Sequence, residues 1–191
     1  IGDPAVRAQY KQFFQHLLNA SKRYQRELIR GTRVAYSGIA GAFANIAANK
    51  IFPDAVAVPH SDFKAAYNSV VNGACECVIL PIENSYNGDV GQVMDLAFFG
   101  PLYINGIYDI GVVQNLLGLK GANISGIKQV ISHPQALGQC HDYIELQNLE
   151  TEESNNTAVA AKRVAKENDK SLGAIASVET AEIYGLEVLA A

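Results

Sequence analysis

The sequence has few cysteines, and their arrangement excludes two kinds of stabilising cross-link. There are only three, Cys75, Cys77 and Cys140, so their number is odd and no framework spacing connects them. Secreted domains that depend on disulfides need paired, regularly spaced cysteines, so that class is excluded. No cysteine and histidine spacing matches a zinc site either. We therefore expect neither a disulfide framework nor a metal.

Several functional motifs are also missing. No apolar run is long enough to span a bilayer, and residues 1–19 alternate charged and apolar groups, unlike a signal peptide. There is no Walker loop, no G-x-G-x-x-G after a strand and no G-x-S-x-G elbow. No basic patch is dense enough for nucleic acid. We interpret the protein as cytoplasmic, with no membrane and no nucleic acid among its partners.

Cations are scarce in the middle of the chain. Between Val34 and Leu119 the only lysines or arginines are Lys50 and Lys64. An anionic ligand bound by this segment must therefore be held mostly by neutral donors. Backbone N–H groups at the amino ends of helices are donors of this kind.

What the sequence does contain is typical of a globular α/β protein. Hydrophobic residues make up 49% and charged residues 18%, with a net charge of −4. A helix is expected over residues 4–28, with a boundary near residue 31. Beyond it, short apolar segments alternate with helical ones, which predicts an α/β fold with largely parallel sheets. Residues 102–117 are rich in Ile, Val and Tyr and predict longer strands that link two lobes.

Four expected strand ends lead into a helix through small or polar residues. They are residues 37–43, 83–88, 132–135 and 154–157. Open α/β sheets bind ligands beyond the carboxyl ends of their strands, so these loops are candidate binding segments. Several helix amino ends that converge would hold an anion. The alternative interpretation is that they are ordinary caps and turns, which every α/β protein has.

Four segments resemble, in the same order, sequence blocks of prephenate dehydratases. V-I-L-P-I-E-N-S at residues 78–85, followed by Gly88, is similar to the P-I-E-N-S/T block. S-H-P-Q-A-L-G-Q-C at residues 132–140 resembles S-H-P-Q-A-L-x-Q-C. N-T-A-V-A-A at residues 156–161 resembles S-T-x-A-A, and Y-G-L at residues 184–186 resembles the block near the end of the domain. Four ordered matches are far more specific than one.

Two further resemblances are looser. G-I-A-G-A-F-A at residues 38–44 resembles the family's G-P-x-G-T-F/Y-S, with Ala42 and Ala44 in place of two hydroxyl residues. The first helix resembles the last helix of the all-helical chorismate mutases, in which a Ser and a Gln face the active site. Here they would be Ser21 and Gln25, which stand one above the other on one helix face. The alternative is that they lie at the edge of an apolar stripe.

Together the resemblances imply a fused mutase–dehydratase. Residues 1–31 would be a mutase helix, and residues 32–191 a dehydratase domain of two α/β lobes with a cleft, like periplasmic binding proteins. Lobe one would hold residues 32–106 and the last strand, residues 186–191, and lobe two residues 107–185. The mutase helix has an apolar face without a partner in its own domain, so we expect it to pack on the lobes or on a neighbouring chain, in a homo-oligomer.

The resemblance implies decarboxylation of prephenate with loss of its ring hydroxyl, which gives phenylpyruvate for phenylalanine biosynthesis. Aromatisation drives this reaction, so no cofactor is needed. The substrate contacts carried over by motif are Asn84, Ser85, Gln135, Ala136, Leu137 and Thr157. Residues expected to support their loops are Glu83, Gly88, Ser132 and His133.

One family block is absent from the sequence. Dehydratases carry Thr-Arg-Phe shortly after Y-G-L, and its Thr is regarded as the proton donor, but the sequence ends at Ala191 before such a block. On this resemblance the chain alone contains no catalytic residue and should be inactive. Two alternatives stay open: a non-enzymatic module that binds a small carboxylate or an amino acid, and an arogenate dehydratase.

Overall fold

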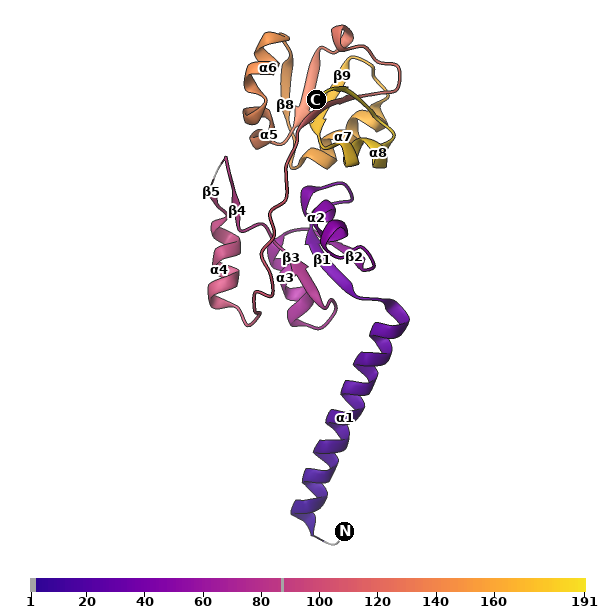
Figure 1. Ribbon diagram of the computed structural model, residues 1–191, viewed down its shortest axis with the longest axis vertical. Helices are drawn as coiled ribbons and strands as arrows, with labels where there is room; N and C mark the ends of the chain where they lie inside the picture. Colours follow the sequence, from indigo (N-terminus) through magenta and orange to yellow (C-terminus); the bar gives the residue numbers. More distant parts are fainter. Residues whose placement is uncertain (1–2, 87) are drawn as a thin grey trace.

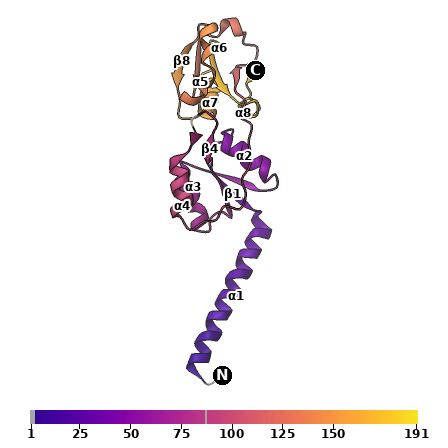
Figure 2. The same ribbon diagram turned by 60° about the vertical axis from the view of Figure 1, so that its left-hand side comes forward.

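A long helix and two stacked lobes make up the protein (Figure 1). The computed structural model describes residues 3–86 and 88–191, except for the side chains of Ala5, Arg23 and residues 26–30. Helix α1 (Pro4–Arg30) projects away from both lobes in two views (Figures 1 and 2). Its apolar side chains are open to solvent, with Phe13 62% and Leu17 54% exposed. Among the described residues, no helix has the length and apolar character needed to cross a lipid bilayer.

Lobe one is built on a small parallel sheet. Its elements in chain order are β1 (Arg33–Ser37), α2 (Phe43–Ile51), β2 (Val56–His60), α3 (Phe63–Val71) and β3 (Cys77–Ile79). The strand order is β2-β1-β3, and both pairings are parallel, so β1 is central. Because β1 has neighbours on both sides, its middle residues Val34 and Ala35 are fully buried. Ala35 and Ala66 of α3 belong to the core that covers one face of the sheet.

A hairpin, a helix and a crossing segment complete lobe one. The hairpin is β4 (Glu83–Asn84) with β5 (Gly88–Asp89), followed by α4 (Gly91–Phe99). Residues 102–114 then run as an irregular coil toward the second lobe (Figure 1). The longer strands predicted over residues 102–117 are therefore wrong except at the end, where residues 115–118 are a strand. Tyr103 is 90% exposed, so the β-branched and aromatic residues of this segment have no sheet to join.

Lobe two contains a mixed sheet with the order β10-β6-β9-β7-β8. Strands β7, β8 and β9 are parallel, whereas β6 and β10 run antiparallel to their neighbours. In chain order the elements are β6 (Asn115–Gly118), a 3-10 turn η1 (Ile124–Gly126), β7 (Gln129–Ser132), α5 (Pro134–Gln139), α6 (His141–Leu146), β8 (Glu150–Glu153), α7 (Thr157–Glu167), β9 (Leu172–Ala176), α8 (Val178–Tyr184) and β10 (Glu187–Ala190). The predicted two-lobed α/β fold with a preceding helix is confirmed.

The last strand does not lie where the sequence predicted. We expected residues 186–191 in lobe one, but β10 pairs with β6 of lobe two, with Val188 opposite Leu117. The cause is local. Gly185 ends α8 with a left-handed φ of +69°, and Leu186 N–H donates to Ala181 O at 2.9 Å. Leu186 is thereby buried in the core of lobe two beside Leu117, which turns the chain back over its own sheet.

The core of lobe two can be tested at Leu117, which is fully buried in β6 between β10 and β9. Leu117→Ala leaves a cavity, so we expect the free energy of unfolding to fall by about 2–5 kcal/mol. Leu146→Ala is the matched control, because Leu146 is 79% exposed, and its effect should stay within about 0.5 kcal/mol. Urea unfolding followed by circular dichroism measures both. Equal losses in the two variants would contradict the assigned core.

Candidate functional site

Two of the predicted loops, both in lobe one, contact lobe two at two points. A β-carbon built on Gly38 would lie 3.6 Å from Asn156 Nδ2, so the first loop of lobe one lies against the amino end of α7. A β-carbon on Gly138 would lie 3.1 Å from the Tyr86 hydroxyl, so the hairpin of lobe one lies against α5. All four segments follow strand ends, as the rule for open α/β sheets requires. Asn87, in the second of these loops, lies outside the described residues.

In lobe two, Ser132 and His133 are tied into the protein. Ser132 is fully buried, and its Oγ donates to Ile175 O of β9 at 2.6 Å. His133 is the N-cap of α5, and its Nδ1 accepts a hydrogen bond from Gln135 N–H at 3.2 Å. Pro134 takes the first helical position, where its missing N–H costs nothing. These contacts hold the strand-to-helix turn in one shape.

The next residues of α5 divide between core and interface. Ala136 is 2% exposed and belongs to the core of lobe two, against which Leu137 also packs. A ligand would therefore reach these two residues mainly through their backbone. Gln135 is half-buried, and its polar side chain is longer than that of Ser132 in the same turn.

The amino end of α7 presents Thr157. Asn156 is the N-cap, and its Oδ1 accepts a hydrogen bond from Val159 N–H at 2.7 Å. The backbone N–H groups that precede Val159 in the first turn take no part in this cap hydrogen bond. Thr157, the first residue of the helix, is 7% exposed and lies next to these donors.

In lobe one, the hairpin carries Asn84 and Ser85 at its turn. Asn84 Oδ1 accepts a hydrogen bond from Tyr86 N–H at 2.8 Å, which shapes the turn and leaves the Asn84 amide nitrogen for other partners. Ser85 is exposed, as are Glu83 and Gly88. Glu83 lies opposite Asp89 in the ladder, so two carboxylates stand side by side at the base of the hairpin.

The first loop of lobe one leads into α2 without a polar cap. Ala42 occupies the N-cap position and makes no side-chain hydrogen bond to the helix. Asn45, 6% exposed, instead accepts a bond from Gly41 N–H at 3.0 Å and closes the loop from inside. Gly41 has φ +86°, and a β-carbon there would lie 3.3 Å from Thr180 Oγ1 of lobe two. Both the left-handed backbone and the close approach therefore favour glycine.

Residues 34–191 match the family model described as "Prephenate dehydratase". The chain belongs to the prephenate dehydratase family. Among curated relatives, "Arogenate dehydratase/prephenate dehydratase 2, chloroplastic" of Arabidopsis thaliana is 40% identical over 158 residues, which cover 83% of this chain and 42% of that protein. "Arogenate dehydratase 2" of Petunia hybrida is also 40% identical over 158 residues, 83% of this chain and 40% of that protein. The chain thus spans less than half of the length of these relatives.

Solved structures agree on the fold of this family member. The prephenate dehydratase of Staphylococcus aureus subsp. aureus Mu50 has a TM-score of 0.72 at 23% identity, over 83% of this chain and 60% of that one. A structure titled "GqqA- a novel type of quorum quenching acylases" has a TM-score of 0.76 at 30% identity, over 82% of this chain and 57% of that one. The family match begins at residue 34, so α1 stands outside it.

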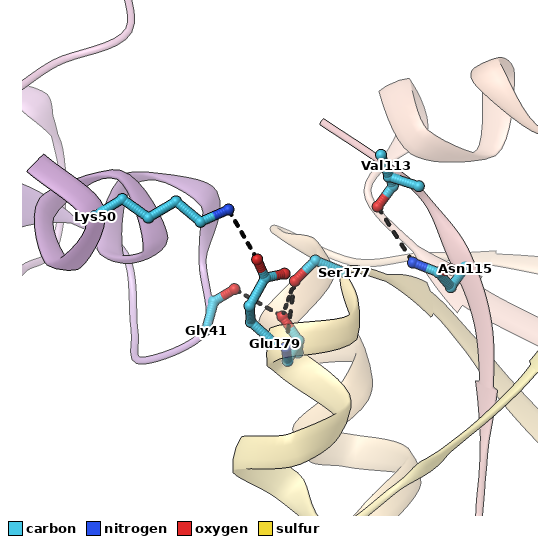
Figure 3. A network of polar contacts seen from close by, with 7 residues as sticks. Gly41, Lys50, Val113, Asn115, Ser177 and Glu179 are labelled. Atoms are coloured by element: carbon cyan, nitrogen blue, oxygen red, sulfur yellow. Dashed lines mark hydrogen bonds and ion pairs between the residues drawn. The ribbon is translucent and has the colours of Figure 1, made fainter. Parts of the chain in front are cut away.

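Two cations of this dehydratase-family chain, Lys50 and Arg163, are already paired with carboxylates. Lys50 of α2 contacts Glu179 of α8 at 2.9 Å, which together with a backbone hydrogen bond lowers the pKa of the Glu179 carboxyl (Figure 3). In lobe two, hydrogen bonds to Glu152 and Glu167 raise the pKa of the Arg163 guanidinium, which stays charged and is balanced by these two carboxylates. An anion at the candidate site would therefore be bound mainly by neutral donors.

The sequence did not predict the polar contact that joins the lobes. Thr180 Oγ1 donates to Gly41 O at 2.7 Å, and the Tyr184 hydroxyl donates to Ala40 O at 2.8 Å. We call these two hydrogen bonds the α8 contact. The available signal was the Y-G-L block, since a tyrosine in the last turn of a helix has a hydroxyl to satisfy. Its acceptor, 144 residues earlier, leaves no trace in local sequence.

The cap of α7 can be tested at Asn156. Asn156→Ala removes the side-chain acceptor of Val159 N–H, so the free energy of unfolding should fall by about 1 kcal/mol. Asn156→Asp keeps a carboxylate oxygen in the same place and is the matched control, with stability close to that of the unchanged protein. Urea denaturation of the three proteins gives the comparison. Equal stability of the Ala and Asp variants would show that this bond contributes nothing.

Proposed function

We propose that this chain forms the substrate-binding part of a dehydratase that converts prephenate to phenylpyruvate. The observation that carries the proposal is the position of the family blocks. The block at residues 78–85 leads into the hairpin of lobe one, and the block at residues 132–140 forms α5, which lies against this hairpin. The block at residues 156–161 opens α7, which lies against the loop at Gly38 of lobe one. Blocks that lie far apart in the sequence thereby contribute to one interface.

The chemistry of prephenate suits such an interface. Prephenate carries two carboxylates and a ring hydroxyl. When the ring carboxylate leaves as carbon dioxide, the released electron pair forms a ring double bond and expels the hydroxyl, which takes up a proton and leaves as water. The enzyme must hold both carboxylates in a fixed orientation until this happens. We assign this binding to Asn84 and Ser85 from lobe one and to Gln135 and Thr157 from lobe two.

Neutral donors are adequate for this task. Hydrogen bonds to a charged group contribute about 1.5–3 kcal/mol each, more than bonds between neutral groups. The amino ends of α5 and α7 add backbone N–H groups and the positive end of each helix dipole. In this proposal Ala136 and Leu137 contribute through their backbone, because their side chains pack in or against the core of lobe two. Glu83, Gly88, Ser132 and His133 shape the turns.

Arogenate is the second candidate substrate, favoured by the names of the relatives that are 40% identical. It carries an ammonium group in place of the side-chain ketone of prephenate. Steady-state rates with the two compounds, measured side by side on a protein that contains the whole domain, decide between them. Turnover of neither compound would favour a module that binds small carboxylates or amino acids without chemistry.

The binding site can be tested without turnover. Calorimetry should detect weak binding of phenylpyruvate, the product, to the 191-residue chain. We expect the triple variant Ser85→Ala, Gln135→Ala, Thr157→Ala to lose it, since three donors are removed from one site. Ser125→Ala, an exposed serine on the 3-10 turn η1, is the control and should bind unchanged. Binding that survives the triple substitution would mean that the pocket lies elsewhere.

We further infer that α1 contributes to a chorismate mutase site. Ser21 and Gln25 lie on one exposed face of the helix, and Gln25 Nε2 donates to Ser21 Oγ at 3.4 Å. One exposed helix face cannot enclose a ligand, so other helices would have to complete the site. We therefore expect no mutase activity from the 191-residue chain.

The mutase proposal makes a separate prediction. In a protein that contains the remaining mutase helices, Gln25→Ala should reduce chorismate turnover strongly and leave dehydratase turnover nearly intact, because α1 projects away from the lobes (Figure 1). Gln12→Ala, also exposed on α1, is the control. Unchanged chorismate rates in Gln25→Ala would refute the assignment.

A further inference from the structure

The Y-G-L block combines three physical roles within three residues. Gly185 ends α8 in the left-handed conformation, and Leu186 anchors the chain in the core of lobe two, 6% exposed. The backbone of Tyr184, the last residue of the helix, is thereby fixed, while its hydroxyl donates to Ala40 O of lobe one. A tyrosine with a mobile backbone would pay more conformational entropy for this bond.

Thr180 stands one helical turn before Tyr184 and repeats the contact. Residues four apart lie on the same face of a helix, so both hydroxyls point at the same loop. Thr180 is fully buried, and since its hydroxyl proton goes to Gly41 O, the Ser177 hydroxyl must donate to Thr180 Oγ1 at 3.0 Å. Two consecutive carbonyls of lobe one are therefore held by a single helix face of lobe two.

The loop that α8 holds also lies against the site. Residues 38–42 contact α8 through the carbonyls of Ala40 and Gly41, and Gly38 lies beside Asn156, the cap that precedes Thr157. The proposed substrate contacts are split between the lobes, and one crossing segment, residues 102–114, leads from the rest of lobe one to lobe two. The separation of the two half-sites must then be set largely by contacts between lobes.

We propose that Thr180 and Tyr184 are positioning residues of the dehydratase reaction, which hold the first loop of lobe one against α7 and so keep the two halves of the substrate site in register. This inference rests on the proposed function. The Thr180 bond is buried and the Tyr184 bond is exposed. The neighbouring Lys50–Glu179 pair is a poorer candidate than Thr180, because its side chains are 55% and 37% exposed and an exposed ion pair contributes little. The Tyr184 hydroxyl keeps its proton as a donor at neutral pH, because the ordinary tyrosine pKa is 10.0 and burial raises it further.

Hydrogen–deuterium exchange of the 191-residue chain tests the positioning directly, without any ligand. In Tyr184→Phe and in Thr180→Val, peptides that cover residues 38–46 should exchange about fivefold faster, the factor that one neutral hydrogen bond corresponds to. Peptides from β7 and β9 should be unchanged. Thr180→Ser keeps the hydroxyl and should restore slow exchange. Glu179→Gln removes the charge of the ion pair with Lys50 but keeps a side-chain oxygen as acceptor, so it should leave exchange unchanged.

Calorimetry with phenylpyruvate on the same proteins tests the link to the site. Affinity should fall about fivefold in Tyr184→Phe and Thr180→Val. The double variant should lose less than the product of the two factors, because both bonds hold one loop. Thr180→Ser and Glu179→Gln should bind like the unchanged chain.

Three results would overturn the inference. Unchanged exchange at residues 38–46 would show that the α8 contact does not hold the loop. Faster exchange throughout lobe two would show a general loss of stability instead of positioning. Faster local exchange with unchanged affinity would separate the loop from the site. If the unchanged chain binds no phenylpyruvate, the proposed binding site fails, while the exchange result still shows whether α8 holds the loop.

Discussion

Two backbone carbonyls of lobe one, those of Ala40 and Gly41, accept the hydrogen bonds that Tyr184 and Thr180 of lobe two donate. A carbonyl is a demanding partner, because its position is set by the backbone and cannot adjust as a side chain does. The loop around it must therefore be rigid before the contact is useful. Asn45 supplies this rigidity from within lobe one by closing the loop on Gly41 N–H. On the other side, Gly185 and Leu186 fix the end of α8.

The same constraint bears on the proposed anion site, which would have to work with few cations. A lysine or arginine placed between the lobes would attract a carboxylate from many directions, whereas a helix amino end binds it in one. Lys50 and Arg163 are occupied by carboxylates of the protein itself. What remains at the interface are side-chain amides, hydroxyls and backbone N–H groups, which act only when the lobes bring them to the correct distance. In the proposed site, the correct relative position of the two lobes thus takes the place of a cation.

Local features of this structure could be predicted from sequence, because their causes are local. The start of α5 follows from His133 and Pro134, and the end of α8 from Gly185. The four loops of the candidate site were predicted from strand-to-helix transitions alone, and the order of the blocks indicated the family. The helix ends and the loops needed only propensities and spacing within about ten residues, whereas the family was indicated by a resemblance of blocks spread over residues 78–186.

Features set by distant partners could not be predicted in this way. Residues 102–114 have strand-forming side chains, but a strand forms only beside a neighbour, and the structure places none there. The last strand was assigned to lobe one, although Leu186 draws it into the core of lobe two. Thr180 donates its buried hydroxyl to a carbonyl that lies 139 residues away in the sequence. The choice of that carbonyl depends on the finished fold.

The crossing segment has a consequence for the integrity of the chain. Extended, exposed backbone is the form in which proteases bind their substrates, and in residues 102–114 Tyr103 is 90% and Ile107 71% exposed. A single cut there would sever the covalent link between the lobes without touching either core. The fragments would then remain together only through their polar and packing contacts, so the nicked protein would behave as a complex whose integrity depends on its concentration.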